Sequence, residues 1–76
     1  MEVKVETRSQ MFDGNEWVEA GIQWYCELAV PAHEVGVKGC PLGRARTKQG
    51  AIEDLVRRIG YESKVKIEPV EVERRW

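Results

Sequence analysis

Several features that define common protein classes are missing from this chain of 76 residues. No apolar run approaches the roughly 20 residues that a helix needs to cross a bilayer. The N-terminal residues alternate between charged and apolar side chains, so they do not resemble the apolar core of a signal peptide. We therefore expect a cytoplasmic protein that has no membrane partner.

Motifs for catalysis and for cofactor binding are equally scarce. The segment from Gly39 to Gly43 lacks the Gly-Lys-Ser/Thr sequence that holds a β-phosphate. The acidic residues do not show the paired spacing that general acid–base catalysis or two-metal catalysis uses. We therefore predict that the chain is not an enzyme and that it requires no cofactor.

Close pairs of cysteines are absent as well. His33 is the only histidine, and six residues separate it from Cys26 on one side and from Cys40 on the other. Such a trio can bind zinc or provide a Cys–His nucleophile pair, but structural zinc sites usually contain a Cys-x2–4-Cys pair. Cys26 falls on the apolar face of a predicted strand, where free cysteine acts as a small hydrophobe. We expect no metal and two free thiols, as is usual in the cytosol.

The chain does have the composition and periodicity of one folded α+β domain over residues 1–76. Hydrophobic residues make up 42% and charged residues 33%, which is typical of a globular domain rather than a disordered one. Apolar and polar residues alternate over 2–8 and over 22–30, and this period of two predicts strands. A short strand is predicted over 43–46, and a closing strand is predicted over 64–72.

A helix is predicted between the last two strands, from about Lys48 to Ile59. Thr47 is a suitable N-cap, and Gly60 can supply the left-handed residue at which a helix stops. The apolar side chains form one stripe at i, i+3, i+4 and i+7: Ile52, Leu55, Val56 and Ile59. The element order β-β-β-α-β therefore predicts an antiparallel sheet of three to four strands with the helix packed on one face.

Charge is distributed unevenly along the chain. Residues 1–35 carry two basic and seven acidic residues, whereas residues 36–76 carry ten basic and six acidic residues. Basic residues gather around the predicted helix: Arg44, Arg46, Lys48, Arg57 and Arg58. They can form a patch for RNA or for an acidic protein surface. Alternatively they form a solvated face that Glu53 and Asp54 balance, and the lack of interleaved aromatic residues favours this second interpretation.

Three tryptophans are many for a chain of this length. Trp24 lies on the apolar face of a predicted strand and is expected in the core. Trp17 follows a turn signal at Asp13-Gly14-Asn15, and Trp76 is terminal, where burial by its own domain is hardest. Because tryptophan is enriched at interface hot spots, either another chain covers at least one of these two or both fold back over the sheet edge.

A glycine-rich corner between Gly39 and Gly43 leads into a short strand, after which the helix begins with the pattern Thr47-x-x-x-Ala51-Ile52-x-x-Leu55. This combination resembles the HicB-like antitoxin fold, which small phage and prophage proteins share. The resemblance is specific over 43–59 and looser over 1–70. It implies a domain with a partly RNase-H-like arrangement and no nuclease centre. Such domains often dimerise and bind a partner protein, which in HicB systems is a toxin RNase.

Together these features predict a non-catalytic protein-binding module that acts by stoichiometric blockade of a partner macromolecule, as a HicB-like antitoxin or accessory protein. The alternatives are a phage-encoded inhibitor of a host defence complex, of the anti-CRISPR type, and a small RNA-binding protein. We expect a homodimer in a bacterial or phage-infected cell that contacts a protein or ribonucleoprotein complex through a strand edge or a sheet face. The predicted contact residues are Trp17, Tyr25, Arg44, Arg46, Lys48, Arg57 and Trp76.

Overall fold

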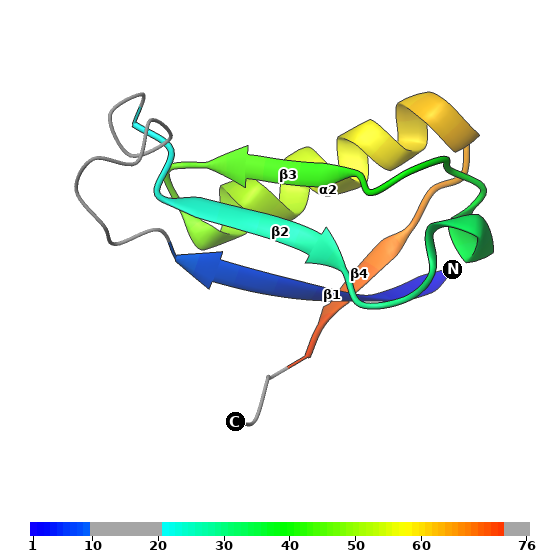
Figure 1. Cartoon of the computed structure of the whole chain (residues 1–76), viewed down its shortest axis with the longest axis horizontal. Coiled ribbons are helices and arrows are strands. Elements are labelled where there is room, and N and C mark those ends of the chain that lie inside the picture. Colours follow the sequence, from blue (N-terminus) through cyan, green and yellow to red (C-terminus); the bar gives the residue numbers. More distant parts are fainter. Residues whose placement is uncertain (10–20, 73–76) are drawn as a thin grey trace.

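The computed structural model of this chain describes residues 1–9 and 21–72. The elements follow the order β1 (Glu2–Ser9), β2 (Trp24–Leu28), the 3-10 helix η1 (Ala32–Val35), β3 (Leu42–Ala45), α2 (Lys48–Ser63) and β4 (Glu68–Glu71) (Figure 1). The predicted α+β class, with one helix packed on one face of a sheet, is confirmed. The predicted turn at 13–15 lies outside the described residues, as do Trp17 and Trp76.

The four strands form one sheet in the order β3-β2-β1-β4. β2 pairs antiparallel with both β1 and β3, whereas β4 pairs parallel with β1. The expectation of a fully antiparallel sheet was therefore wrong for this last pair. The reason is that α2 carries the chain back to the end of the sheet where β3 began, so β4 runs in the same direction as β3 and β1.

The core lies between α2 and one face of the sheet. α2 contacts β3, β2 and β1 with the apolar stripe that the sequence predicts. The buried apolar residues are Val3, Val5, Cys26, Val35, Val37, Ala51, Ile52, Leu55, Ile59 and Ile67. Trp24, which was expected in the core, is half-buried and packs against its margin.

Gly43 lets β3 lie directly against the backbone of α2. A Cβ atom at this position would stand 2.2 Å from the carbonyl oxygen of Ala51 and 2.5 Å from the amide nitrogen of Leu55. Both of those atoms belong to the helix backbone, which cannot move aside as a flexible side chain can. A residue without a side chain is therefore required where β3 and α2 cross.

The ends of α2 agree with the prediction at one side only. The Thr47 side chain accepts a hydrogen bond from the N–H of Gly50 at 3.0 Å, which confirms the N-cap. The predicted stop at Gly60 was wrong, because the helix continues to Ser63. Lys64 instead adopts the left-handed conformation, with φ of 58°, and its N–H donates to the Gly60 carbonyl.

The remaining boundaries move by a few residues. The strand predicted over 22–30 is limited to β2, and the one predicted over 64–72 is limited to β4. β4 is an edge strand, as the proline at position 69 indicated. The loop predicted between β2 and β3 contains η1. Within the described ranges, no helix combines the length and the apolar composition needed to cross a bilayer.

Candidate partner-binding face

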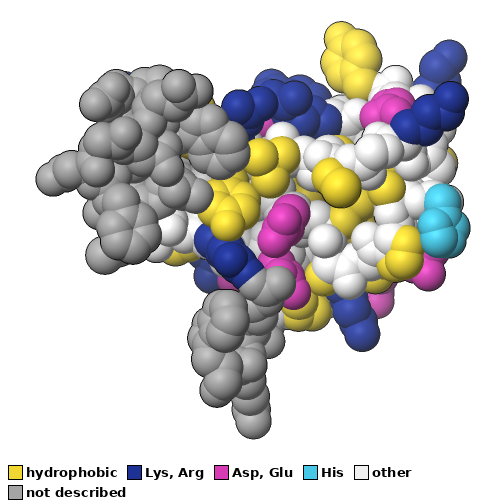
Figure 2. All heavy atoms as spheres, in the orientation of Figure 1, with side chains coloured by type: hydrophobic (Ala, Val, Ile, Leu, Met, Phe, Trp, Pro, Cys, Tyr) yellow, Lys and Arg dark blue, Asp and Glu magenta, His cyan; other side chains and the backbone are white. Residues whose placement is uncertain are grey.

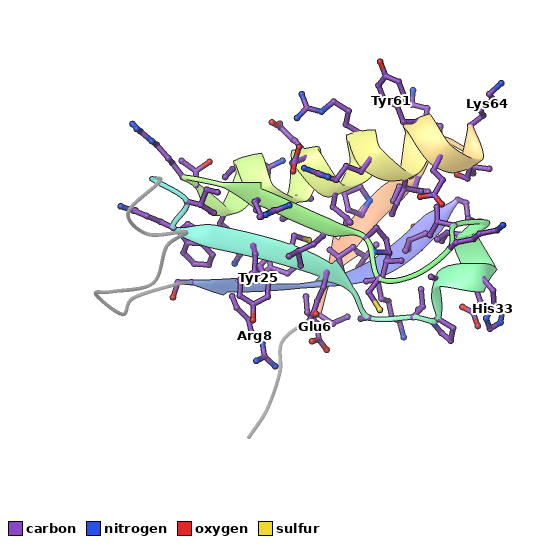
Figure 3. The ribbon with its side chains drawn as sticks, turned by 45° about the horizontal axis from the view of Figure 1, so that its top comes forward. Glu6, Arg8, Tyr25, His33, Tyr61 and Lys64 are labelled. Atoms are coloured by element: carbon purple, nitrogen blue, oxygen red, sulfur yellow. The ribbon has the colours of Figure 1, made fainter. Side chains whose placement is uncertain are left out.

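The face of the sheet opposite α2 is not covered by any helix of residues 1–9 and 21–72. Strand side chains alternate between the two faces of a sheet. The buried residues Val5 and Cys26 point toward α2, so the residues next to them in each strand point away from it. Figure 3 shows Glu6, Arg8 and Tyr25 on this outward side. We call this surface the open face; it is formed by Lys4, Glu6, Arg8, Tyr25, Glu27, Leu42 and Arg44.

One row of side chains crosses the open face from β1 to β3. The strand register places Arg8 opposite Tyr25, and Tyr25 opposite Arg44. A tyrosine therefore lies between two arginines, and all three residues are half-buried. Each of them also takes part in at least one polar, ionic or ring contact. Tyrosine and arginine are enriched at protein interfaces and among their hot spots.

The next row along the strands has the opposite charge. Glu6 of β1 stands directly opposite Glu27 of β2, and Leu42 of β3 follows in the same row. Figure 2 shows acidic side chains in the middle of this view of the molecule, beside hydrophobic ones. Like charges directly opposite each other destabilise a sheet. The register therefore brings two carboxylates together on this face, and Glu6 also takes part in a polar or ionic contact.

Asp54 of α2 blocks the edge of β3. The backbone N–H of Arg44, in this edge strand, donates to Oδ2 of Asp54 at 2.9 Å. Arg57 Nη2 donates to Asp54 Oδ1 at 2.5 Å, and Arg58 Nε donates to Asp54 Oδ2 at 3.0 Å. This backbone donor at the edge of β3 is thus already used, and the side chains of Arg57 and Arg58 lie beside it.

The Asp54 carboxylate is held in its charged form. Burial alone raises the pKa of this carboxyl, but the hydrogen bonds from Arg44, Arg57 and Arg58 outweigh burial. The pKa falls from 3.8 to about 2 as a result. Asp54 is therefore a structural anion that fixes α2 against β3.

Pro69 blunts the opposite edge of the sheet. The N–H groups of Glu68 and Val72 donate to the carbonyls of Met1 and Val5, so position 69 turns its nitrogen outward. Proline has no N–H at that position, and edge strands with proline resist the addition of another strand. Both described edges are therefore poor sites for strand addition, which leaves the open face as the better contact surface.

The structure separates the predicted contact residues into different surfaces. Tyr25 and Arg44 lie side by side on the open face, whereas Arg57 lies on the flank of α2 beside Asp54. Lys48 begins α2 and forms an ion pair with Glu71 of β4 at 2.5 Å. The guanidinium of Arg46 lies close to the backbone of Gly21. The predicted basic group is thus not one patch.

Glu71 joins the start of α2 to two strands. Lys48 hydrogen-bonds this carboxylate, which lowers its pKa; burial opposes that effect, and a hydrogen bond from the Thr7 hydroxyl at 3.0 Å supports it. This contact uses Lys48 for the packing of α2 on β4 and β1. The ion pair with Glu71 therefore competes with the predicted role of Lys48 in partner binding.

Sequence reasoning predicted neither Leu42 nor four charged residues as part of the open face, and the four charged residues are Lys4, Glu6, Arg8 and Glu27. The sequence feature that could have identified the charged residues is the regular alternation of polar and apolar side chains in β1 and β2, which places them on the polar side of each strand. Which of them stand opposite one another depends on the register, and the register was not predicted from either strand alone.

The cysteines and the histidine lie apart. The Cys26 thiol is fully buried, and burial raises its pKa to about 12, with smaller contributions from Glu71 and Glu27. Cys40 is exposed, and both cysteines are free thiols. His33 is exposed on η1 (Figure 3). Among the described residues, no three His, Cys, Asp or Glu side chains are arranged to hold a metal ion.

The open face therefore offers a contact surface built from one basic, aromatic row and one acidic row. Its neighbours are a fixed anion at one edge of the sheet and a proline at the other. Comparisons of this chain with protein-family models, with curated proteins and with solved structures found no match.

Proposed function

We propose that this chain is a non-catalytic protein-binding module that blocks a partner macromolecule by occupying it stoichiometrically. The open face is the contact surface. The proposal rests on the row in which Tyr25 lies between Arg8 and Arg44, on a sheet face that no helix of the described residues covers. Half-buried aromatic and arginine side chains supply contact area and directional hydrogen bonds, which is why they dominate interface energetics.

The alternation of charge favours a protein over a nucleic acid as the partner. A phosphate backbone that contacts Arg8 and Arg44 would also meet the carboxylates of Glu6 and Glu27 in the next row. The chain as a whole carries a net charge of −1, which does not attract polyanions. A protein surface can alternate in sign to match these rows, and such complementarity gives specificity.

The HicB-like form of this proposal is supported by the element order of three strands, a helix and a last strand, and by the helix that begins after Thr47. In this form the partner is a toxin RNase. A phage-encoded inhibitor of a host defence complex would use the same blockade on another target. A small toxin gene beside this one would favour the first form, and a cluster of anti-defence genes would favour the second.

Capture of a partner from a lysate of the native host tests the role of the open face. The matched variants are Tyr25→Ala, on the open face, and Tyr61→Ala, on α2, where Tyr61 is 83% exposed (Figure 3). We expect Tyr25→Ala to weaken partner binding about tenfold or more, because hot-spot side chains contribute more than about 1 kcal/mol. Tyr61→Ala should bind as the unchanged chain does.

Circular dichroism and thermal unfolding of both variants serve as the control for folding. Equal retention of one partner by the unchanged chain and by folded Tyr25→Ala would contradict the assignment of the open face. Failure of the unchanged chain to retain any partner at a defined ratio would contradict the proposed blockade itself.

RNA binding is a second candidate, because a tyrosine between two arginines can stack on an unpaired base. If RNA is the ligand, the affinity for single-stranded RNA should fall steeply as salt is added, since phosphate contacts release bound cations. The double variant Arg8→Ala plus Arg44→Ala should flatten that dependence. Affinity that does not change with salt would exclude this function.

A further inference from the structure

A small hollow adjoins the open face where β2 ends and β3 begins. Its volume is about 200 Å³, and its walls come mainly from Leu28, Val30, Pro31, Pro41 and Leu42. Leu42 belongs to the acidic row of the open face, so the hollow and the open face are continuous.

The size of the hollow limits what can occupy it. Pockets that enclose drug-sized ligands measure roughly 300–1,000 Å³, so a hollow of about 200 Å³ suits a smaller group. An aliphatic side chain of a partner is of the appropriate scale, and the apolar walls provide a favourable environment for it. Interface hot spots are commonly side chains that insert into pockets of this kind.

The charge beside the hollow indicates which group of the partner lies next to the inserted side chain. Glu27 lines the hollow, and no residue of 1–9 or 21–72 forms a hydrogen bond or an ion pair with its side chain. Glu6, which has a polar or ionic contact of its own, stands directly opposite Glu27, and like charges in this position repel each other. A cation placed over Glu27 would relieve the repulsion while the apolar group fills the hollow.

We infer that this hollow is an anchor site for an aliphatic side chain of a protein partner, flanked in the partner by a lysine or arginine that pairs with Glu27. The inference rests on the proposed function and names the chemistry of the partner segment. It makes the acidic row a specificity element, since an acidic residue at the same place in a partner would be repelled.

Three small probes with one shared apolar body test the inference on the chain alone. They are 3-methylbutylamine, 3-methylbutan-1-ol and 3-methylbutanoate, which carry a positive, a neutral and a negative head group. Binding is followed by NMR through the methyl signals of Leu28, Val30 and Leu42. We expect the amine to bind most tightly, up to about fivefold better than the alcohol, as an exposed ion pair allows.

Two glutamate variants separate the ion pair from the apolar contact. Glu27→Gln should reduce the affinity of the amine to that of the alcohol and leave the alcohol unchanged. Glu53→Gln, an exposed position on α2, is the matched control and should change neither affinity.

Cys40 provides an independent readout, because it lines the hollow and is exposed, whereas Cys26 is buried. Bound amine should slow alkylation of Cys40 in proportion to its occupancy, and Cys26 should stay unmodified in the folded chain. Absence of methyl shifts with all three probes would overturn the inference. Equal affinity for the amine and the carboxylate, or tighter binding of the carboxylate, would also overturn it.

A failure of the anchor site can be distinguished from a failure of the proposed function. If the probes bind as expected but Tyr25→Ala still retains the partner, the open-face assignment fails and the anchor site stands. If Tyr25→Ala loses the partner but the probes do not bind, the anchor site fails and the open-face assignment stands.

Discussion

Gly43 shows how one position decides the distance between two elements. The sequence placed a glycine at the start of a short strand, which is consistent with a turn, a bulge or a close approach. Only the packed structure shows which applies, because the obstructing atoms belong to Ala51 and Leu55, eight and twelve residues further along the chain. A contact of this kind depends on how α2 crosses β3, and local periodicity does not report that crossing.

A pair of glycine variants tests this conclusion. Gly43→Ala should lower the free energy of unfolding by about 2–3 kcal/mol, because the helix backbone must move to admit the new methyl group. Gly60→Ala should raise it by about 0.5–1 kcal/mol, since alanine favours helix and the nearest atom to its Cβ, the Val65 carbonyl oxygen, is 4.0 Å away. Urea denaturation measures both changes, and equal stabilities for the two variants would refute the close approach.

At the scale of elements, α2 is the best-predicted part of the chain, and its attachment is the least predictable. Its apolar stripe and its Thr47 cap follow from periodicity and capping chemistry, and both are present. Asp54 and Arg58 have the i, i+4 spacing that favours an ion pair on a helix, and this pair is present. The bond of Asp54 to the Arg44 backbone could not be foreseen, because it requires β3 to lie beside that turn of α2.

The other end of α2 shows the same limit. Gly60 has the residue type that usually ends a helix, yet the helix continues for three residues and Lys64 adopts the left-handed conformation. The Ser63 hydroxyl donates a hydrogen bond to the Ile59 carbonyl at 2.8 Å, and the Lys64 N–H donates one to the Gly60 carbonyl. Two carbonyls of the last turn therefore have hydrogen-bond partners. Propensity was therefore overridden by hydrogen bonds available three residues further on.

The hydrogen bonds by which Asp54 joins α2 to β3 predict that the stability of the fold depends on pH in the acid range. The pKa of Asp54 is about 2 in the folded chain, below its ordinary value of 3.8, so its stabilising contribution is complete above pH 4. That contribution is lost as the pH falls from about 4 toward 2. Asp54→Asn should lower the free energy of unfolding by about 1–3 kcal/mol at neutral pH and should weaken the further loss in acid.

Urea denaturation between pH 2 and pH 7 measures this effect. Glu53→Gln is the control, because it removes a neighbouring carboxylate that is exposed on α2. If Asp54→Asn and the unchanged chain lose stability equally over this pH range, the Asp54 carboxylate does not fix the helix in the manner described.

In the overall architecture of the described residues, one helix covers one face of a four-stranded sheet, and this asymmetry was predictable. One amphipathic helix can bury only one sheet face, and the polar sides of β1 and β2 indicated which face would remain. What the sequence could not provide is the register that aligns Arg8, Tyr25 and Arg44, because a shift of one strand relative to another leaves its own alternation unchanged. The candidate site is thus a product of assembly rather than of a motif.

The parallel pairing of β4 with β1 belongs to the overall architecture too. The sequence showed an edge strand with a proline and did not show its direction, which depends on how α2 returns the chain. This topology places Pro69 at one edge, while Asp54 covers the other, so an added strand would find neither edge well suited. This arrangement of the edges supports the proposal that a partner binds the open face.

Photo-crosslinking tests directly whether the partner contacts the open face at Tyr25. A photo-reactive phenylalanine analogue replaces Tyr25 in one sample and Tyr61 in a matched control, and each is irradiated in the presence of the captured partner. We expect a covalent adduct with one copy of the partner from position 25 and none from position 61. A stoichiometric complex that crosslinks from position 61 and not from position 25 would contradict this expectation.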